Sequence, residues 1–282
     1  MISLIVATKD RVAELERLLA SLMAQSYREF EVIIVDQNPD DRLAPVLERA
    51  ANLAIKHLRC APGVSLARNL GIRVAHGELI AFPDDDCWYP PDLLASVRAW
   101  FAEHPEFAVL LTATRDQHGQ VMAPKFPLKR GACTKTSILR CAVTFNAFFR
   151  AEAVRAIGFF REDIGPGTSS PYQSSEDIDY LIRPIEHGFA AWHETDLTVY
   201  HPNFKSRERL LQKIYPYSLG LGHVLRSHNY PWWVIGEAAL RSLCGAALHL
   251  CKFDWEGARL YGLRAKGQLQ GYFGKQHAPT GP

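Results

Sequence analysis

The stretch Gly-Glu-Leu-Ile-Ala-Phe-Pro-Asp-Asp-Asp, residues 77–86, decides the fold of this 282-residue chain more than any other. Its apolar run at 79–82 is followed almost at once by three consecutive aspartates. Carboxylates crowded in this way repel one another unless a positive charge lies between them, and hard oxygen ligands suit Mg²⁺ or Mn²⁺. The pattern indicates a buried strand whose end holds a divalent cation. An acidic turn that caps the next helix is the alternative.

Apolar runs and helical segments alternate along residues 1–86. Short runs rich in β-branched residues lie at 2–7, 30–35, 54–58 and 79–82, and the segments between them have helical spacing. This alternation predicts βαβ units and a parallel sheet.

A helix is predicted after the third of these strands. Ser65 is the expected N-terminal cap. Leu66, Leu70, Ile72 and Val74 are the expected buried side of this helix.

Polar side chains follow three of the predicted strands. Thr8 ends the first strand, Asp36 the second, and Asp84–Asp86 the fourth. Ligands of open α/β sheets bind at the carboxyl ends of the strands, so these groups are expected at one site. The sequence has no GxGxxG after the first strand and no GxxxxGK[ST] motif, which argues against a dinucleotide-binding fold and a P-loop.

The central part of the chain is less regular. Strands are predicted at 109–113 and 144–149, with two further short strands at 190–193 and 197–200. A loop rich in Gly, Ser and Pro at 165–171 leads into a sequence that is typical of a helix start, with Ser before Glu and Asp.

The C-terminal part of the chain is basic. Residues 202–282 contain 11 Lys or Arg and 4 Asp or Glu, a net charge of +7, whereas residues 1–201 carry −5. This asymmetry favours contact with an anionic surface such as a membrane or a phosphorylated carrier, with a merely solvated pair of helices as the alternative. An apolar stretch at 232–252 contains Glu237 and Arg241, which can pair. These charges argue against a spanning helix, so the stretch either lies on a membrane or packs on the protein.

The cellular setting is predicted from cysteine usage and the first residues. Six cysteines lack CxxC spacing and are too sparse for a disulfide scaffold, which favours a reducing cytosol. The run at 2–7 is short for a signal peptide and is followed by charged residues. We therefore expect a cytoplasmic protein, with peripheral contact to the inner face of the plasma membrane as an extension of that expectation, and no nucleic-acid partner.

Taken in order, these motifs resemble the family 2 glycosyltransferases of the GT-A fold. The resemblance rests on Thr-Lys-Asp-Arg at 8–11, Val-Asp at 35–36, Ser-Leu-Ala-Arg-Asn-Leu-Gly-Ile at 65–72, Phe-Pro-Asp-Asp-Asp at 82–86, and Ser-Glu-Asp-Ile-Asp at 175–179 with Arg183. It implies an α/β fold with a Rossmann-like, mostly parallel sheet flanked by helices. The implied catalytic domain spans 1–203, with a nucleotide-sugar-binding half at 1–106 and an acceptor and catalytic half at 107–203. A basic helical extension at 204–282 completes the chain.

The resemblance also implies an activity. An inverting enzyme of this kind moves a sugar from a nucleotide-sugar to a hydroxyl of a saccharide or lipid-linked saccharide, assisted by Mg²⁺ or Mn²⁺. A UDP-sugar is the first expectation, and a GDP- or dTDP-sugar is the alternative. A sugar nucleotidyltransferase would usually carry a glycine-rich loop where this chain has 8–11. A non-catalytic sugar-binding protein would not need Asp84, Asp86 and Asp177 together.

The resemblance assigns donor-binding residues at the ends of the strands. Two departures, Thr-Lys-Asp-Arg in the first loop and Pro83 before the aspartates, leave the choice of donor open. The residues expected beside the nucleotide-sugar are Ala7, Thr8, Asp10, Asp36, Arg68, Asp84 and Asp85.

The resemblance assigns the metal ligands and the base as well. Asp84 and Asp86 match the outer residues of the DxD motif, with Asp86 as the first choice for a direct ligand. His201 is the expected additional ligand, with a plain strand-end histidine as the alternative. Asp177 is the expected general base; Glu176 beside it is the second catalytic candidate.

Overall fold

The computed structural model describes residues 1–122, 130–140, 143–203 and 207–274. The chain divides into two compact units, one made of residues 1–160 and 180–203, the other of residues 161–179 and the segment from 204 onward. The loop at 161–179 therefore groups with the C-terminal helices, although the sequence resemblance placed it in the half at 107–203. Residues 204–206 and 275–282 of the predicted extension lie outside the described residues.

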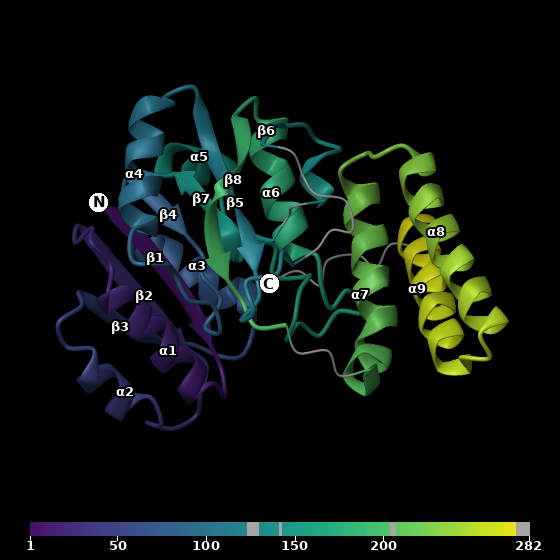
Figure 1. Ribbon diagram of the computed structural model, residues 1–282, viewed down its shortest axis with the longest axis horizontal. Coiled ribbons are helices and arrows are strands. Elements are labelled where there is room, and N and C mark those ends of the chain that lie inside the picture. Colours follow the sequence, from purple (N-terminus) through teal and green to yellow (C-terminus); the bar gives the residue numbers. More distant parts are fainter. Residues whose placement is uncertain (123–129, 141–142, 204–206, 275–282) are drawn as a thin grey trace. The chain divides into compact units, whose positions relative to one another are not determined.

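The first unit is built on a mixed sheet of eight strands in the described residues, in the order β3-β2-β1-β4-β7-β5-β8-β6 (Figure 1). The strands are β1 (Ile2–Thr8), β2 (Phe30–Asp36), β3 (Ile55–Arg59), β4 (Leu79–Ala81), β5 (Phe107–Arg115), β6 (Gly131–Cys133), β7 (Ala147–Arg150) and β8 (Ala190–Tyr200). β1 pairs in parallel with β2 and β4, β2 with β3, and β5 with β8. β7 is antiparallel to both β4 and β5. The predicted sheet, mostly parallel, is confirmed.

Helices cover this sheet and close its core. They are α1 (Val12–Met23), α2 (Ala44–Arg49), α3 (Val64–Val74), α4 (Leu93–Glu103), α5 (Ala151–Ile157) and α6 (Glu176–Glu186), whose first residues belong to the second unit. Two 3₁₀ turns lie at Ile138–Arg140 and Thr144–Asn146. α1 shows how sequence sets the packing: Leu15, Leu18, Leu19 and Leu22 recur at helical spacing and are all buried in the core.

The helix α3 differs from its prediction. It begins after Gly63, so Ser65 lies inside the helix and is buried rather than capping it. The buried side carries Ser65, Ala67, Arg68, Asn69 and Gly71, and the predicted apolar side is only half-buried. Gly71 allows this close packing, because a Cβ there would lie 2.3 Å from Ile5 Cγ2.

The strand β8 replaces the two short strands that the sequence predicts. Its register against β5 shifts between Thr112 and Ala113, whose partners are Glu194 and Thr198. The residues between these partners bulge from the ladder, which explains the break in the apolar pattern. The strand continues to Tyr200 and delivers His201 at its end.

The C-terminal part of the second unit consists of α7 (Arg207–Ser227), α8 (Trp232–Cys251) and α9 (Trp255–Phe273). α9 packs against both α7 and α8. Glycines permit the close approach of α7 and α9: a Cβ on Gly271 would lie 2.1 Å from the Leu219 carbonyl oxygen, and one on Gly222 2.3 Å from that of Gln268. The predicted C-terminal helical region is thus confirmed, and its spaced glycines serve helix packing.

Candidate functional site

The ends of β1, β2 and β4 meet at one edge of the sheet. β1 lies between β2 and β4, and Thr8 is in register with Asp36. Because all three strands are parallel, the polar residues that follow them come together at this edge. The predicted convergence of three strand ends is therefore present in the first unit.

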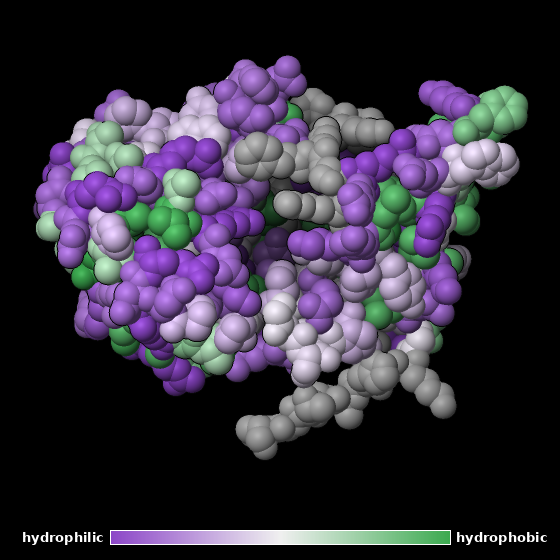
Figure 2. All heavy atoms as spheres, turned by 90° about the horizontal axis from the view of Figure 1, so that it is seen from below, coloured by the Kyte–Doolittle hydropathy of each residue, from purple (hydrophilic) through white to green (hydrophobic). Residues whose placement is uncertain are grey.

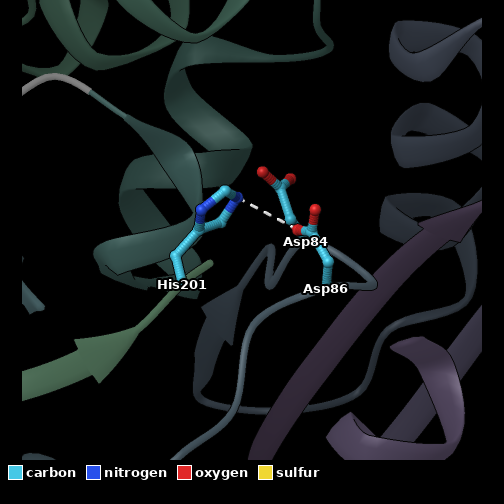
Figure 3. Close-up of side chains that lie close together, drawn as sticks. All are labelled: Asp84, Asp86 and His201. Carbon is cyan, nitrogen blue, oxygen red and sulfur yellow. Dashed lines mark ion pairs between the residues drawn. The ribbon is translucent and has the colours of Figure 1, made fainter. Parts of the chain in front are cut away.

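Asp84, Asp86 and His201 form a cluster at this edge (Figure 3). One ligand atom from each residue lies within 4.8 Å of the others. His201 Nε2 is 3.0 Å from Asp86 Oδ1, and both side chains point toward Asp84. Residues 115 positions apart in sequence thus form a single group of potential metal ligands.

A short bridge between backbone segments brings the histidine to the aspartates. Trp88 and Tyr200 exchange two backbone hydrogen bonds, each 3.0 Å long, and their rings stack with centroids 5.5 Å apart. Trp88 lies two residues after Asp86, and Tyr200 lies one residue before His201. The bridge therefore fixes the distance between the loop after β4 and the end of β8.

The donor atoms of this cluster fit a divalent cation. Asp86 Oδ1 is buried and accepts no directed hydrogen bond from the described residues, although His201 Nε2 lies nearby. His201 Nδ1 lies 2.9 Å from the Pro202 carbonyl oxygen, which can only accept a hydrogen bond. In the neutral imidazole, this contact places the proton on Nδ1 and leaves a lone pair on Nε2, as in metal-binding histidines.

The charges around the cluster are strongly coupled. Burial raises the pKa of Asp85 to about 6, against the opposing effect of Arg11. Burial would also raise the pKa of Asp86, but its contact with His201 and the positive charges of His201 and Arg11 outweigh burial and lower it. For His201, burial acts to lower the pKa, and the contact with Asp86 together with the charges of Asp86 and Asp84 raises it.

Arg11 is the functional residue that sequence reasoning missed. Its Nη1 lies 2.8 Å from Asp85 Oδ1 and 2.5 Å from Asp86 Oδ2, so one guanidinium group bridges two aspartates. It supplies a positive charge between aspartates that would otherwise repel one another, a role for which the sequence predicts a divalent cation. Arg11 could have been predicted from its place in the loop after β1, because that loop lies beside the ends of the neighbouring strands.

Arg68 lies beside the cluster, and its contact with a nucleotide stays a prediction. Its side chain is buried on α3, its Nη2 is 3.1 Å from Asp84 Oδ1, and its guanidinium lies 5.2 Å from the ring centroid of Phe160. Asn69 next to it holds that ring in place by exchanging two hydrogen bonds with the Phe160 backbone, of 2.9 and 2.7 Å. The polar side of α3 therefore supports the edge of the site.

Asp36 has a structural role in the turn after β2. Its carboxylate has no exposed surface, and its Oδ1 accepts hydrogen bonds from the backbone and side-chain nitrogens of Asn38, at 2.8 and 2.7 Å. Its Oδ2 lies 3.1 Å from His57 Nε2. Contact between Asp36 and a nucleoside stays a prediction.

The loop after β1 is tied to the same turn. Asp10 has a positive φ of 61°, and its backbone N–H donates to Asn38 Oδ1 at 2.8 Å. Its exposed carboxylate accepts from Arg42 Nη1 at 2.7 Å. Thr8 is buried, and Ala7 pairs with Val35 in the ladder. These residues line the strand ends, and their contact with a donor stays a prediction.

The acidic start of α6 lies in the second unit. Glu176 is buried against Gly165, where a Cβ would lie 2.9 Å from Glu176 Oε2. Asp179 is also buried, with its Oδ1 3.1 Å from His228 Nε2 and 3.8 Å from Arg161 Nη1. Asp177 is half-buried, and its Oδ1 accepts the backbone N–H of Ile178 at 2.8 Å. Asp177 is the most accessible of the three acids, which suits a group that must meet a substrate.

The family of the chain follows from comparison with known proteins. The model of glycosyl transferase family 2 matches residues 3–158, more than half of the sequence. The chain therefore belongs to this family, as the motifs of the first strands and the acidic triplet indicate.

Curated relatives resemble the N-terminal part of the chain. An uncharacterized glycosyltransferase from Haemophilus influenzae is 34% identical over 107 residues, which is 37% of this chain and 36% of the relative. The poly(ribitol-phosphate) β-N-acetylglucosaminyltransferase TarS from Staphylococcus aureus is 30% identical over 115 residues, which is 39% of this chain and 20% of TarS. The aligned segments thus span about a third or less of these relatives.

Solved structures share the fold over nearly the whole chain. Residues 1–349 of TarS from S. aureus, in complex with UDP-GlcNAc, match 97% of this chain and 93% of that structure, with a TM-score of 0.64 and 17% identity. The mannosyltransferase PcManGT from Pyrobaculum calidifontis, in complex with GDP-Man and Mn²⁺, matches 98% of this chain and 88% of that structure, with a TM-score of 0.61 and 18% identity. The predicted GT-A fold is confirmed.

Proposed function

We propose that this protein is an inverting glycosyltransferase that moves a sugar from a nucleotide-sugar to a hydroxyl of a saccharide or lipid-linked saccharide. The observation that carries the proposal is the cluster of Asp84, Asp86 and His201 at the carboxyl ends of the strands, in a chain of glycosyl transferase family 2. Buried Arg68 adds a positive charge beside it.

The cluster would hold a divalent cation through one carboxylate oxygen each from Asp84 and Asp86 and through His201 Nε2. Such an ion neutralises the diphosphate of the donor and the charge that the leaving group gains as the glycosidic bond breaks. Two oxygens and an imidazole nitrogen fit Mn²⁺ better than Mg²⁺, because Mg²⁺ prefers oxygen ligands.

Side chains of the protein supply the remaining chemistry. Arg68 would hold a phosphate oxygen by a charge-assisted hydrogen bond. Arg11 contacts both Asp85 and Asp86 and would hold these two carboxylates in place when the donor and the metal ion bind. Asp177 would take the proton of the acceptor hydroxyl as that oxygen attacks the anomeric carbon from the face opposite the leaving group, and this attack inverts the centre.

The nature of the donor is inferred from the neighbours. TarS resembles this chain in sequence and in fold, and one of its structures contains UDP-GlcNAc. We therefore place a UDP-sugar first, ahead of the GDP-sugar bound in the mannosyltransferase structure.

A donor screen tests this proposal. The protein is incubated with UDP-, GDP-, dTDP- and CMP-sugars, with Mn²⁺ or with a chelator, and release of the nucleotide is measured. We expect slow hydrolysis of UDP-sugars that requires the metal ion. Absence of both hydrolysis and binding for every donor would sink the proposal.

Substitution of the base tests the mechanism. Asp177→Asn should keep donor affinity within about threefold and lower transfer about 10²–10⁴-fold, since an amide cannot take the proton. Asp179→Asn is the matched control two residues away. It removes the negative charge that faces His228 and Arg161, so it should lower thermal stability more than the rate of the folded enzyme. If Asp177→Asn transferred sugar at a near-normal rate, the base would lie elsewhere.

A further inference from the structure

The helix α8 turns its large apolar side chains away from the protein. Trp232, Trp233, Leu240, Leu243 and Leu250 are between 45% and 63% exposed, and we call these five residues the outer face of α8. Hydrophobic surface is visible over the C-terminal helices, at the right of Figure 2.

The side of α8 that packs on α9 is made of smaller or more polar groups. Ile235, Ala239 and Ser242 are buried, and the Ser242 hydroxyl lies 3.1 Å from Gln268 Oε1. Gly245 meets the ring of Tyr261, where a Cβ would lie 2.6 Å from Cδ1. The helix thus has the reverse of the pattern expected for a soluble protein, which buries its leucines.

The outer face is continuous and uncharged. With about 100° of rotation per residue, its members span an arc of about 100°, and the positions between them are Gly, Ala or Cys. The charged residues Glu237 and Arg241 lie beyond one edge of this arc and pair with each other at 3.0 Å. Exposed apolar surface of this extent marks a binding surface.

We propose that the outer face of α8 inserts into the headgroup and acyl boundary of a membrane that contains anionic lipid. Aromatic residues lie at both ends of the helix, with Trp232 and Trp233 at its start and the exposed Phe253 and Trp255 just beyond its end. Such side chains favour the membrane–water interface.

The net positive charge of the C-terminal segment favours an anionic lipid surface, and not a second copy of the chain, as the partner of the outer face. The segment 202–282 carries a net charge of +7, so two copies that met through α8 would bring like charges together. An anionic bilayer complements this charge, and each basic residue near its surface strengthens binding about fivefold.

The helix lies along the membrane and does not span it. Among the described residues, α8 is the one helix whose length and composition would allow a span, and little of it is buried. A span would carry the Glu237–Arg241 pair into the hydrocarbon, together with α9, which packs along α8 and contains Arg259, Arg264 and Lys266. A helix in the plane of the interface keeps these charges in water.

The proposal does not depend on the transferase activity. Sedimentation of the full chain with vesicles tests it, using phosphatidylcholine alone or mixed with phosphatidylglycerol, at low salt. We expect binding to the anionic vesicles, loss of that binding at high salt, and quenching of tryptophan fluorescence by lipids brominated in the acyl chain.

Two sets of variants distinguish insertion of the outer face from nonspecific adsorption to the vesicles. The double substitution Leu240→Glu and Leu243→Glu should weaken vesicle binding at least about tenfold, because it removes two apolar side chains from the interface. Leu210→Glu on α7, where an equally exposed leucine lies outside the outer face, should leave binding unchanged. Thermal melting of each variant confirms that it is folded.

Three results would overturn the proposal: no binding of the unmodified chain to anionic vesicles, equal binding of the double variant, or a concentration-dependent dimer in light scattering that the double variant abolishes. The nucleotide-sugar binding of the same preparations is a separate measurement. Its failure would remove the proposed activity and leave the vesicle result standing.

Discussion

The helices α3 and α8 depart from the amphipathic pattern in opposite ways. α3 buries Arg68 and Asn69 and leaves its leucines half-buried, whereas α8 exposes leucines and tryptophans and buries Ala239 and Ser242. In α1, by contrast, the leucines at helical spacing are buried as the pattern predicts.

Each departure has a local physical reason. The polar side of α3 lies beside the carboxylate cluster, where Arg68 pairs with Asp84. A leucine in place of Arg68 would leave that carboxylate without the positive charge that compensates it. The apolar side of α8 has no counterpart among the described residues, so it is suited to a partner outside the chain. The comparison teaches that a helix whose pattern contradicts its packing marks a functional surface.

The largest effect is expected for the buried arginine of α3. Arg68→Ala should lower kcat/KM for a UDP-sugar about 10- to 100-fold, because it removes a charge-assisted hydrogen bond beside the diphosphate. Arg73→Ala on the exposed side of the same helix, where the guanidinium lies over Phe159, is the control and should leave kcat/KM unchanged. Equal losses for the two variants would mean that α3 acts only as a scaffold.

A smaller effect is expected for Asn69. Asn69→Ala removes both hydrogen bonds to the buried Phe160 backbone and should lower the free energy of unfolding by about 1–3 kcal/mol, measured by urea denaturation. A change below about 0.5 kcal/mol would show that the polar side of α3 is accessible to water. The contrast between α3, which buries polar residues, and α8, which exposes apolar ones, would then be wrong.

The smallest effect is expected on the outer face of α8. Leu240→Glu should change the free energy of unfolding by no more than about 0.5 kcal/mol, since the side chain is already in water. Ile235→Ala, on the buried side of the same helix, is the control and should cost about 2–4 kcal/mol. If Leu240→Glu destabilised the protein as much as Ile235→Ala, the leucine would be buried and the membrane proposal would lose its basis.

The sequence predicts the elements of the sheet well, because strand and helix periods are local. The apolar runs at 2–7, 30–35 and 79–82 appear as β1, β2 and β4, and the motif order identifies the GT-A fold. The bulge that makes β8 one strand could not be predicted, because it depends on pairing with β5, a strand far away in sequence.

The candidate site is predicted less completely. The aspartates could be predicted because three of them stand together after a strand. His201 could be predicted because it directly follows the last predicted strand. The bridging role of Arg11 and the burial of Asp36 depend on contacts between separate loops, which no local pattern contains. Periodicity predicted the wrong buried side of α3 for a similar reason. The carboxylate that compensates the charge of buried Arg68 is Asp84, 16 residues away in sequence.

Calorimetric titration of a UDP-sugar with and without Mn²⁺ tests the central claim most directly. For the unmodified protein we predict binding that depends on Mn²⁺. For Asp86→Ala we predict loss of that dependence with an intact fold, and for Glu208→Gln, a carboxylate substitution at the exposed start of α7, unchanged binding. Unchanged, Mn²⁺-dependent affinity in Asp86→Ala would contradict the account, because the cluster of Asp84, Asp86 and His201 would then not hold the metal ion.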